Sequence, residues 1–203
     1  MADAKISALA ALTGANTDPV NDVFVIVDTS ATTDKKIAVA EVAKAMHVMG
    51  TEQASTSGTS IDFTGIPAGV KRITIMFVGV STNGTSHKLI QLGDAGGFEA
   101  TGYSGASTTL SNGTPSSTNY TTGFGIESSS ASDALHGTIT LTLENASAFT
   151  WTATGIIAAS NGAGTWTSAG SKSLSAELTQ VRITTVNGSD AFDAGAINIQ
   201  YEY

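Results

Sequence analysis

The chain has 203 residues, which is enough to bury a full hydrophobic core in one or two domains. Only 13% of the residues are charged, about half the usual share, so Ser, Thr, Asn and Gly must supply much of the surface. The formal net charge of −8 argues against a nucleic-acid partner, because the phosphate backbone is itself negative. The absence of cysteine excludes disulfides, thiol catalysis and thiolate metal sites.

Three elements are predicted near the N-terminus. The stretch "DVFVIVD" (22–28) predicts a short buried strand, and "TSATTDKK" (29–36) predicts a polar turn. A helix is expected over "AVAEVAKAM" (38–46), because its apolar residues recur at helical spacing.

The next segment, "GTEQASTSGTS" (50–60), has the composition of a linker. We therefore expect a small α+β segment over residues 1–53 and a second domain over residues 54–203. The first 30 residues show no signal-peptide pattern, and no apolar stretch approaches the roughly 20 residues of a membrane helix. Synthesis in a cytoplasm without membrane insertion is expected.

From about residue 59 onward the chain is predicted to be mainly β. Short runs rich in β-branched and aromatic residues alternate with Asn-Gly and Ser-Gly steps, which favour tight turns. The pattern is typical of an antiparallel β-sandwich, here expected to be jelly-roll-like. The predicted strands are "TSIDFT" (59–64), "KRITIMFVGV" (71–80), "HKLIQLG" (87–93), "TTGFGIE" (121–127), "HGTITLTLE" (136–144), "FTWTATGIIAA" (149–159), "SKSLSAEL" (171–178), "QVRITTV" (180–186) and "AINIQYEY" (196–203).

Alternation along a strand separates its two faces. In residues 136–144, Ile and Leu occupy one face and Thr the other, which predicts a core face and a threonine face. Residues 72–80 differ, because both faces of that strand are apolar. Such a strand either lies at the centre of a two-layer core or has its second face covered by another subunit. The residues expected to make these contacts are Ile73, Ile75, Met76, Phe77 and Val78.

No catalytic template fits the sequence. The segment around Ser104 lacks the helix that must follow a nucleophile elbow, and "GDAGG" (93–97) lacks the context of a dinucleotide site. His47, His87 and His136 are far apart, without the spacing of metal ligands, and are expected to be exposed or structural. We therefore expect a protein that is not an enzyme and binds no cofactor.

Acidic residues in the presumed loops would support glycoside hydrolysis only if two carboxylates lay about 5 to 9.5 Å apart. Their scatter favours caps and turns instead. The segment "GSDAFDAG" (188–195) lacks the ligand count of a calcium loop, so turn structure is expected there and no metal site is predicted. The acidic candidates are Asp94, Glu99, Glu127, Asp133, Glu144, Asp190 and Asp193.

Aromatic residues offer a different kind of site. If Trp151 and Trp166 are exposed, they can stack on sugar rings; if they are buried, they belong to the core. The core interpretation is favoured over the sugar-stacking one. Together with Tyr103 and Tyr120, they are the candidate glycan contacts.

The segments "KISALAALTGAN" (5–16) and "DVFVIVDTSATTDKKIAVAEVAKAM" (22–46) resemble the N-terminal anchoring segment of many tailed-bacteriophage virion proteins. In that pattern, K-I-S-x-L and L-T-G-A precede an I-V-D strand and then a T-K-K-I-T-V-A-E-L-like strand and helix. Ala38 and Val42 depart from the commoner Thr and Leu. The resemblance implies virion anchoring through Ile6, Leu9, Leu12, Val25, Ile26 and Val27.

Most of the remaining chain resembles a β-rich module of phage fibre and decoration proteins. The resemblance lies in "IDFTGIPAGVKRITIMFVGVSTNGTS" (61–86), "IQLGDAGGFEATGYSG" (90–105) and "VRITTVNGSDAFDAGAINIQYEY" (181–203). It implies a structural protein on the virion surface, with the N-terminal segment docked on other virion proteins and the β domain pointing outward. Such proteins are commonly homotrimers.

Three functions compete at this stage. The first is a capsid decoration (cement) or head-fibre protein, in line with a short anchor leading into a single module. The alternative is a tail fibre or receptor-binding protein that recognises host-surface glycans. A polysaccharide-depolymerising enzyme has the weakest support, because the acidic residues form no compact group in the sequence.

Overall fold

The structure is a computed structural model that describes residues 18, 21–28, 33–111, 114–162 and 164–203. The chain divides into two compact units, Met1–His47 and Val48–Tyr203. The division falls a few residues before the end of the segment that the sequence predicts as the N-terminal one.

The first unit contains a β-hairpin and a short helix. Strands β1 (Val23–Asp28) and β2 (Thr33–Ala38) pair antiparallel, with Val23 opposite Ala38, and helix α1 (Val39–Met46) follows directly. Strand β2 occupies part of the segment that was expected to be a polar turn. No helix among the described residues is long and apolar enough to cross a membrane.

Not every expected anchoring residue can be placed. Val25, Ile26 and Val27 lie in β1, and Ile6, Leu9 and Leu12 lie outside the described residues. The anchoring role of all six therefore stays a prediction.

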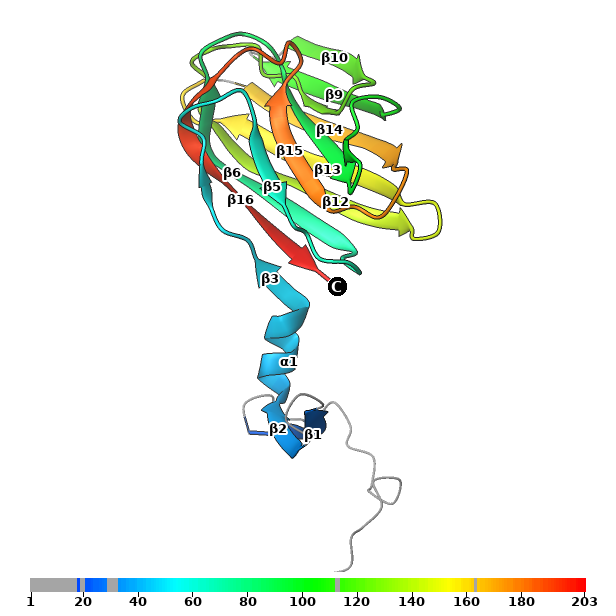
Figure 1. Cartoon of the computed structure of the whole chain (residues 1–203). Coiled ribbons are helices and arrows are strands. Elements are labelled where there is room, and N and C mark those ends of the chain that lie inside the picture. The colour runs from blue at the N-terminus through cyan, green and yellow to red at the C-terminus, as the bar shows by residue number, and fades with distance from the viewer. Residues whose placement is uncertain (1–17, 19–20, 29–32, 112–113, 163) are drawn as a thin grey trace, which may run out of the picture. The chain divides into compact units, whose positions relative to one another are not determined.

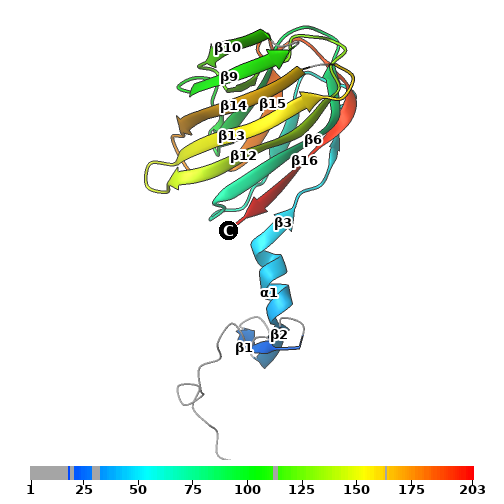
Figure 2. The ribbon, with the colours of Figure 1, turned by 180° about the vertical axis from the view of Figure 1, so that it is seen from behind.

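The second unit is an antiparallel β-sandwich, which confirms the predicted fold class at that level (Figure 1). The larger sheet has nine strands in the order β10-β9-β14-β13-β12-β6-β16-β3, with β4 paired to β16. Its strands are β3 (His47–Met49), β4 (Gln53–Ala54), β6 (Arg72–Thr82), β9 (Ser104–Ser111), β10 (Thr114–Tyr120), β12 (Leu135–Asn145), β13 (Thr150–Ala159), β14 (Gly164–Ser173) and β16 (Phe192–Glu202). Figure 2 shows this sheet from its outer side.

The smaller sheet has five strands and covers the inner face of the larger one (Figure 1). Its order is β11-β7-β15-β5, with β8 paired to β7. The strands are β5 (Ile61–Thr64), β7 (Lys88–Asp94), β8 (Gly97–Phe98), β11 (Phe124–Ile126) and β15 (Gln180–Thr185). Strand β7 is buried along its whole length.

The hydrophobic core lies between the two sheets. Alternate residues of β6 and β12 point into it, so that Ile73, Ile75, Ile139 and Leu141 are fully buried. The threonines between them face outward, as the alternation predicts. The C-terminal strand β16 pairs with β6 on one side and with β3 and β4 on the other, so it lies inside the sheet.

The doubly apolar strand β6 has one face in this core and one face outside it. Ile73, Ile75 and Phe77 are buried, whereas Met76 is half-buried and Val78 is 58% exposed. The intrachain core therefore accounts for the inner face only. The outer face keeps exposed apolar side chains.

Residues 50–60 are part of the sandwich, so the interpretation of this segment as a linker was wrong. Gln53 and Ala54 pair with β16, and Ser55 is fully buried with its Oγ donating to the Ala194 carbonyl at 2.8 Å. The Gln53 Nε2 donates to the Asp62 carbonyl at 2.7 Å. Small polar side chains are suited to this position because they satisfy backbone carbonyls at the edge of the core.

The alternation along β12 predicts a large difference between two neighbouring substitutions. Leu141→Ala removes a fully buried side chain and should lower the free energy of unfolding by about 2–5 kcal/mol. Thr142→Ala, on the exposed face, should change it by less than about 0.5 kcal/mol. Urea unfolding of both variants measures the difference. Equal losses at the two positions would contradict the assignment of the faces.

Candidate functional site

A row of polar side chains crosses one end of the larger sheet on its inner face. Trp166 of β14 lies opposite Thr109 of β9, and Thr109 lies opposite Ser116 of β10. Neighbouring strands are about 4.8 Å apart, so these three side chains stand next to one another. Trp166 is buried, and its indole packs over Gly164 of the same strand: a Cβ added at Gly164 would lie 2.5 Å from the ring.

These residues line a pocket with a volume of about 210 Å³, which we call the polar pocket. The other lining residues come from the start of β7, the segment after β11 and the beginning of β14. They are His87, Glu127, Ser129, Ser130, Asp133 and Gly164.

Glu127 is held in the polar pocket by three hydrogen bonds. Its Oε1 accepts from Ser116 Oγ at 3.0 Å and from Thr118 Oγ1 at 2.8 Å, and its backbone N–H donates to Ser107 Oγ at 3.3 Å. Both side-chain bonds go to one carboxylate oxygen. The other oxygen, Oε2, is buried and has no partner among the described residues.

Two more buried polar atoms of this pocket lack a partner in the described part of the chain: Trp166 Nε1 and Thr109 Oγ1. An unsatisfied buried donor or acceptor costs about 1–3 kcal/mol. Native proteins therefore meet such atoms with ordered water or a ligand. The residues that carry these three atoms line one pocket, although the atoms themselves are buried, and this pocket is the candidate site of this protein.

His87 separates the polar pocket from a second hollow. Its Nδ1 lies 2.6 Å from the Tyr120 hydroxyl, and both residues also line a cavity of about 450 Å³ together with Ser86, Thr118 and Val186 among others. Burial lowers the pKa of His87, although the Glu127 carboxylate acts in the opposite direction. Burial also raises the pKa of Tyr120, as does Glu127. Both side chains are therefore mainly uncharged at neutral pH.

A buried lysine lies behind Asp133. Lys88 is fully buried, and its Nζ donates to Ser128 Oγ at 3.4 Å, which in turn donates to Asp133 Oδ2 at 2.8 Å. Burial lowers the pKa of Lys88, against the attraction of Asp133 and of two more distant carboxylates. The chain of contacts fixes the Asp133 side chain at the rim of the pocket.

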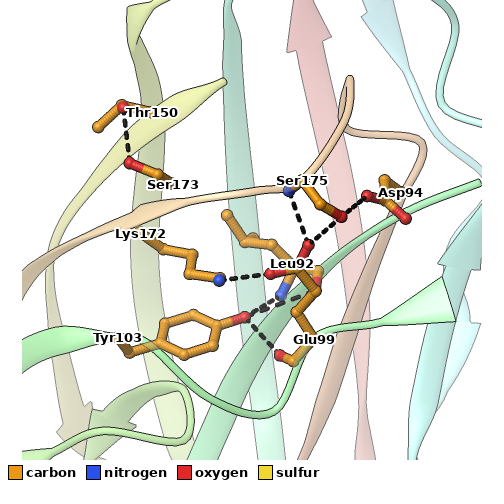
Figure 3. A network of polar contacts seen from close by, with 8 residues as sticks. All are labelled: Leu92, Asp94, Glu99, Tyr103, Thr150, Lys172, Ser173 and Ser175. Carbon is orange, nitrogen blue, oxygen red and sulfur yellow. Dashed lines mark hydrogen bonds and ion pairs between the residues drawn. The ribbon is translucent and has the colours of Figure 1, made fainter. Parts of the chain in front are cut away.

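A second polar cluster has a different character (Figure 3). Glu99 forms an ion pair with Lys172, which is only 6% exposed, and accepts hydrogen bonds from Ser175 N at 2.8 Å and Ser175 Oγ at 2.9 Å. The Tyr103 hydroxyl accepts from Leu92 N at 2.7 Å and donates to the Glu99 carbonyl at 3.0 Å. We call this group the Glu99–Lys172 network.

The network is internally satisfied. Burial acts to raise the pKa of Glu99. The hydrogen bond and charge of Lys172 and the hydrogen bonds from Ser175 nevertheless hold this pKa below its usual range. The Lys172 ammonium also lies 5.5 Å from the centre of the Tyr103 ring, in cation–π contact. These bonds tie β7, β14 and two loops together, so the network stabilises the fold.

The structure separates the four aromatic candidates. Tyr103 belongs to the Glu99–Lys172 network, and Trp151 is a core residue beside a mainly apolar cavity of about 130 Å³. Trp166 lines the polar pocket, and Tyr120 contacts it through His87. Only Tyr120 and Trp166 are thus brought together, and both are buried, so neither offers an exposed stacking platform.

The acidic candidates are also distributed. Asp94 and Glu99 both contact the hydroxyl of Ser175, at 2.6 and 2.9 Å. Glu127 and Asp133 line the polar pocket. No group of three or more His, Asp or Glu side chains in the described ranges is placed to hold a metal ion.

The remaining acidic residues lie in turns or on the surface. Asp190 shapes its turn by accepting from Ser86 N at 2.9 Å and from Asn187 Nδ2 at 2.6 Å, and Asp193 accepts from Ser81 Oγ. Glu144 is exposed near the end of β12.

Sequence reasoning missed several residues of the pocket. Thr109 and Ser116 lie in strands β9 and β10, which the hydrophobic pattern did not predict. His87 was grouped with the exposed or structural histidines, but the structure places it between two cavities. No sequence signal distinguishes these residues from the other Ser, Thr and His residues.

Comparison with known proteins gives no assignment: no family model matches the chain, and no curated protein or solved structure matches it.

The Glu99–Lys172 network predicts non-additive effects on stability. Glu99→Gln leaves the Lys172 ammonium buried without its carboxylate and should lower the free energy of unfolding by roughly 3 kcal/mol. Adding Lys172→Met removes the unpaired charge and should restore part of that loss. A double-mutant cycle by urea unfolding measures the coupling. Strictly additive losses would show that the pair contributes nothing as a pair.

His87 predicts a dependence of stability on pH. The unfolded chain binds a proton at this residue near pH 6.5, whereas in the folded protein burial lowers its pKa below that value. The free energy of unfolding should therefore fall as the pH drops below about 6.5, by at most about 1.4 kcal/mol per pH unit. Chemical unfolding at a series of pH values down to about 5, above the usual range of carboxylates, measures this slope.

His87→Gln should flatten the slope between about pH 6.5 and 5. The matched control is His136→Gln, because His136 is exposed, and it should leave the slope unchanged. A slope that survives in His87→Gln would assign the dependence to another group.

Proposed function

We propose that this protein is a non-enzymatic structural protein displayed on the surface of a tailed-bacteriophage virion, namely a capsid decoration (cement) or head-fibre protein that docks through residues 1–53. The sequence resemblance over residues 5–46 and over the β domain supports the virion location. Exposed apolar side chains in the first unit, at Val23, Phe24 and Met46, are suited to docking on another protein.

The structural observation that carries the proposal is the outer face of the larger sheet (Figure 2). Three cross-strand rows of outward side chains run across β9, β14, β13, β12, β6 and β16. They read Thr108, Thr167, Ile156, Thr138, Met76, Asn198; then Ala106, Ala169, Thr154, Thr140, Thr74, Gln200; then Ser104, Ser171, Thr152, Thr142, Arg72, Glu202. The only ionised side chains in these rows are Arg72 and Glu202, which form an ion pair at one corner.

This uncharged face is suited to close packing of subunits. A chain with a net charge of −8 repels its own copies, but a face whose rows carry ionised side chains only as an ion pair at one corner can meet another subunit without burying an unpaired charge. Ile156 and Val78 add exposed apolar area, at 60% and 58% exposure. We infer that this face takes part in a homotrimer or in contacts with neighbouring virion proteins.

If the protein is displayed on a capsid shell, its packing there should stabilise the shell. A protein that binds only the assembled lattice stabilises that lattice by its binding free energy.

Two finer parts of the fold prediction belong with this proposal. The jelly-roll-like form of the sandwich and the anchoring function of the α+β segment stay predictions.

The second candidate is a tail fibre or receptor-binding protein that recognises host-surface glycans. The polar pocket favours it, because a recess lined by polar and acidic side chains is suited to a polar ligand. The two candidates differ in where the protein sits on the particle.

Cryo-electron microscopy of purified virions that carry the protein with a labelled C-terminal tag should show density arrayed regularly on the capsid. Density confined to the tail would replace the first candidate with the second. Virions without the protein would contradict both candidates.

If the outer face of the larger sheet packs against another subunit, a charge introduced on that face should weaken assembly. Ile156→Lys places an ammonium in the middle of the uncharged face and should shift the purified protein from an oligomer towards the monomer in sedimentation velocity. Val186→Lys is the matched control, because Val186 is similarly exposed, at 52%, but follows β15 of the other sheet. A monomeric wild-type protein, or equal effects of both substitutions, would contradict the packing of identical subunits through this face.

A further inference from the structure

We propose that the cavity of about 130 Å³ beside Trp151, which we call the apolar cavity, binds one aromatic ring. The ring can belong to a free molecule or to a side chain of another protein, because the chemistry that recognises it is the same. The inference goes beyond the proposed function and does not depend on it, since ring binding can be measured wherever the protein lies on a virion.

The apolar cavity is bounded by hydrophobic side chains from several parts of the chain. Val70 precedes β6, Leu143 lies near the end of β12, Trp151 belongs to β13, and Leu178 precedes β15. Phe149, in the turn between β12 and β13, completes the wall. Carbon atoms form most of the lining. A polar ligand would lose its hydrogen bonds to water here without replacing them, so the ligand class is apolar.

The walls of the apolar cavity can be reached from solvent. Leu143 and Phe149 are half-buried, and Ala146, which also lines the cavity, is exposed. A ligand can therefore enter at the turn between β12 and β13 and contact these side chains while the core stays folded.

The volume of the apolar cavity suits a single ring. An apolar cavity of about 150 Å³ in a protein can stay dry and bind benzene, and this one has about 130 Å³. Phe149 and Trp151 both line it, and neither makes a ring–ring contact with an aromatic side chain in the described ranges. Aromatic rings gain from edge-to-face or offset contacts beyond the burial of area. An aromatic ligand can make such contacts here, whereas an aliphatic one cannot.

The backbone of Phe149 is strained. Its φ is 49°, the only positive φ of a non-glycine residue in the part of the chain that the structure describes. A bulky side chain is disfavoured in this left-handed region, which glycine adopts without penalty. Strained residues of this kind cluster at ligand-binding sites. Phe149 thus keeps a ring at the cavity in a position where the backbone conformation favours glycine.

Hydrogen bonds between the loops fix the walls of the apolar cavity. The backbone N–H of Leu143 donates to the Lys71 carbonyl at 2.8 Å, and the Phe149 carbonyl accepts from the first residue after β14 at 3.1 Å. The backbone N–H of Gly69 donates to Glu177 Oε1 at 2.7 Å. Each of these bonds joins segments that are far apart in the sequence. A cavity that is already formed loses little conformational entropy when a ligand binds.

The experiment uses the two tryptophans of the full-length chain, Trp151 and Trp166. In ¹⁵N-labelled protein they give two indole N–H signals, and Trp166→Phe assigns them by removing one. Trp166 pairs with Ile157, six residues beyond Trp151 on β13, so the two strand positions are about 20 Å apart. Benzene should therefore shift the Trp151 signal in a saturable manner and leave the Trp166 signal in place.

Three probes define the ligand class. Benzene is the free ring, N-acetylphenylalaninamide carries the ring as a protein side chain does, and 1,4-dioxane is a polar ring of similar size. Tighter binding of the amide than of benzene would support a side chain of a protein partner, and the reverse would support a free aromatic molecule. If neither aromatic probe shifts the Trp151 signal up to its limit of solubility, or if dioxane shifts it as strongly as benzene, the proposal is overturned.

Substitutions in the turn between β12 and β13 then test the site. Ala146→Leu extends an exposed side chain at the cavity and should weaken benzene binding at least tenfold by occupying its space. The matched control is Ala148→Leu, which makes the same change at an exposed position outside the lining and should leave the affinity unchanged. Phe149→Leu keeps an apolar side chain but removes the ring, and it should weaken benzene binding roughly twofold to tenfold.

An unchanged Trp166 signal shows that each variant is folded, because Trp166 is buried in the sandwich. Wild-type affinity in folded Ala146→Leu and Phe149→Leu proteins would overturn the assignment of the site, and so would equal losses in the Ala146 and Ala148 variants. Benzene binding by a protein that electron microscopy does not find on virions would support the apolar cavity while contradicting the proposed function, so the two proposals fail separately.

Discussion

The packing of one sheet on the other is the interaction on which the rest of the structure depends. The inner faces supply fully buried Ile and Leu side chains such as Ile75, Leu141, Leu92 and Ile183. Apolar area removed from water contributes roughly 25 cal/mol per Å², so this interface dominates the stabilisation of the sandwich. It also limits where polar side chains can lie, since a polar group between the sheets is tolerated only where it has a partner.

Two polar groups at the margins of that interface show the two outcomes of this constraint. In the Glu99–Lys172 network, charge, hydroxyl and backbone groups satisfy one another, and the result is a fixed connection between strands and loops. In the polar pocket, Ser116 and Thr118 satisfy only one oxygen of Glu127, and the indole and the Thr109 hydroxyl are left over. The difference lies in the remaining hydrogen-bonding capacity rather than in residue type. It is the reason to regard the first group as structural and the second as the candidate functional site.

The sequence predicted those parts of the fold in which hydrophobic alternation is strong. Strands β6, β12, β13 and β16 have β-branched residues at period two, and the structure places them close to the expected ranges. Strands β9 and β10 were missed because Ser, Thr and Gly dominate them, so their pairing depends on β14 rather than on local preference.

The segment 171–178 was predicted as one strand, but β14 ends at Ser173. Leu174 and Leu178 are buried from a loop instead. Their spacing of four residues fits the alternation of a strand, but tertiary packing rather than strand pairing accounts for their burial.

The sequence indicated some of the residues of the candidate site but not that they lie together in the fold. Trp166, Tyr120 and Glu127 each stood out as aromatic or acidic residues, but nothing in the order of residues shows that they converge. Their convergence depends on the register of β14 with β9 and on the strand β11 that leads into Glu127. These are contacts between segments far apart in the sequence, and a hydrophobic pattern carries no information on such a register.

The same strands carry both proposed surfaces, and the period of two keeps these surfaces apart. On β14, Trp166 points into the polar pocket, while its neighbour Thr167 points to the uncharged outer face. On β9, Thr109 and Thr108 divide in the same way. A subunit packed on the outer face therefore contacts neither Trp166 nor Thr109. Assembly through one face of the sheet and a polar pocket behind the other are compatible in one small sandwich, and a charge introduced on the outer face should change assembly without changing the pocket.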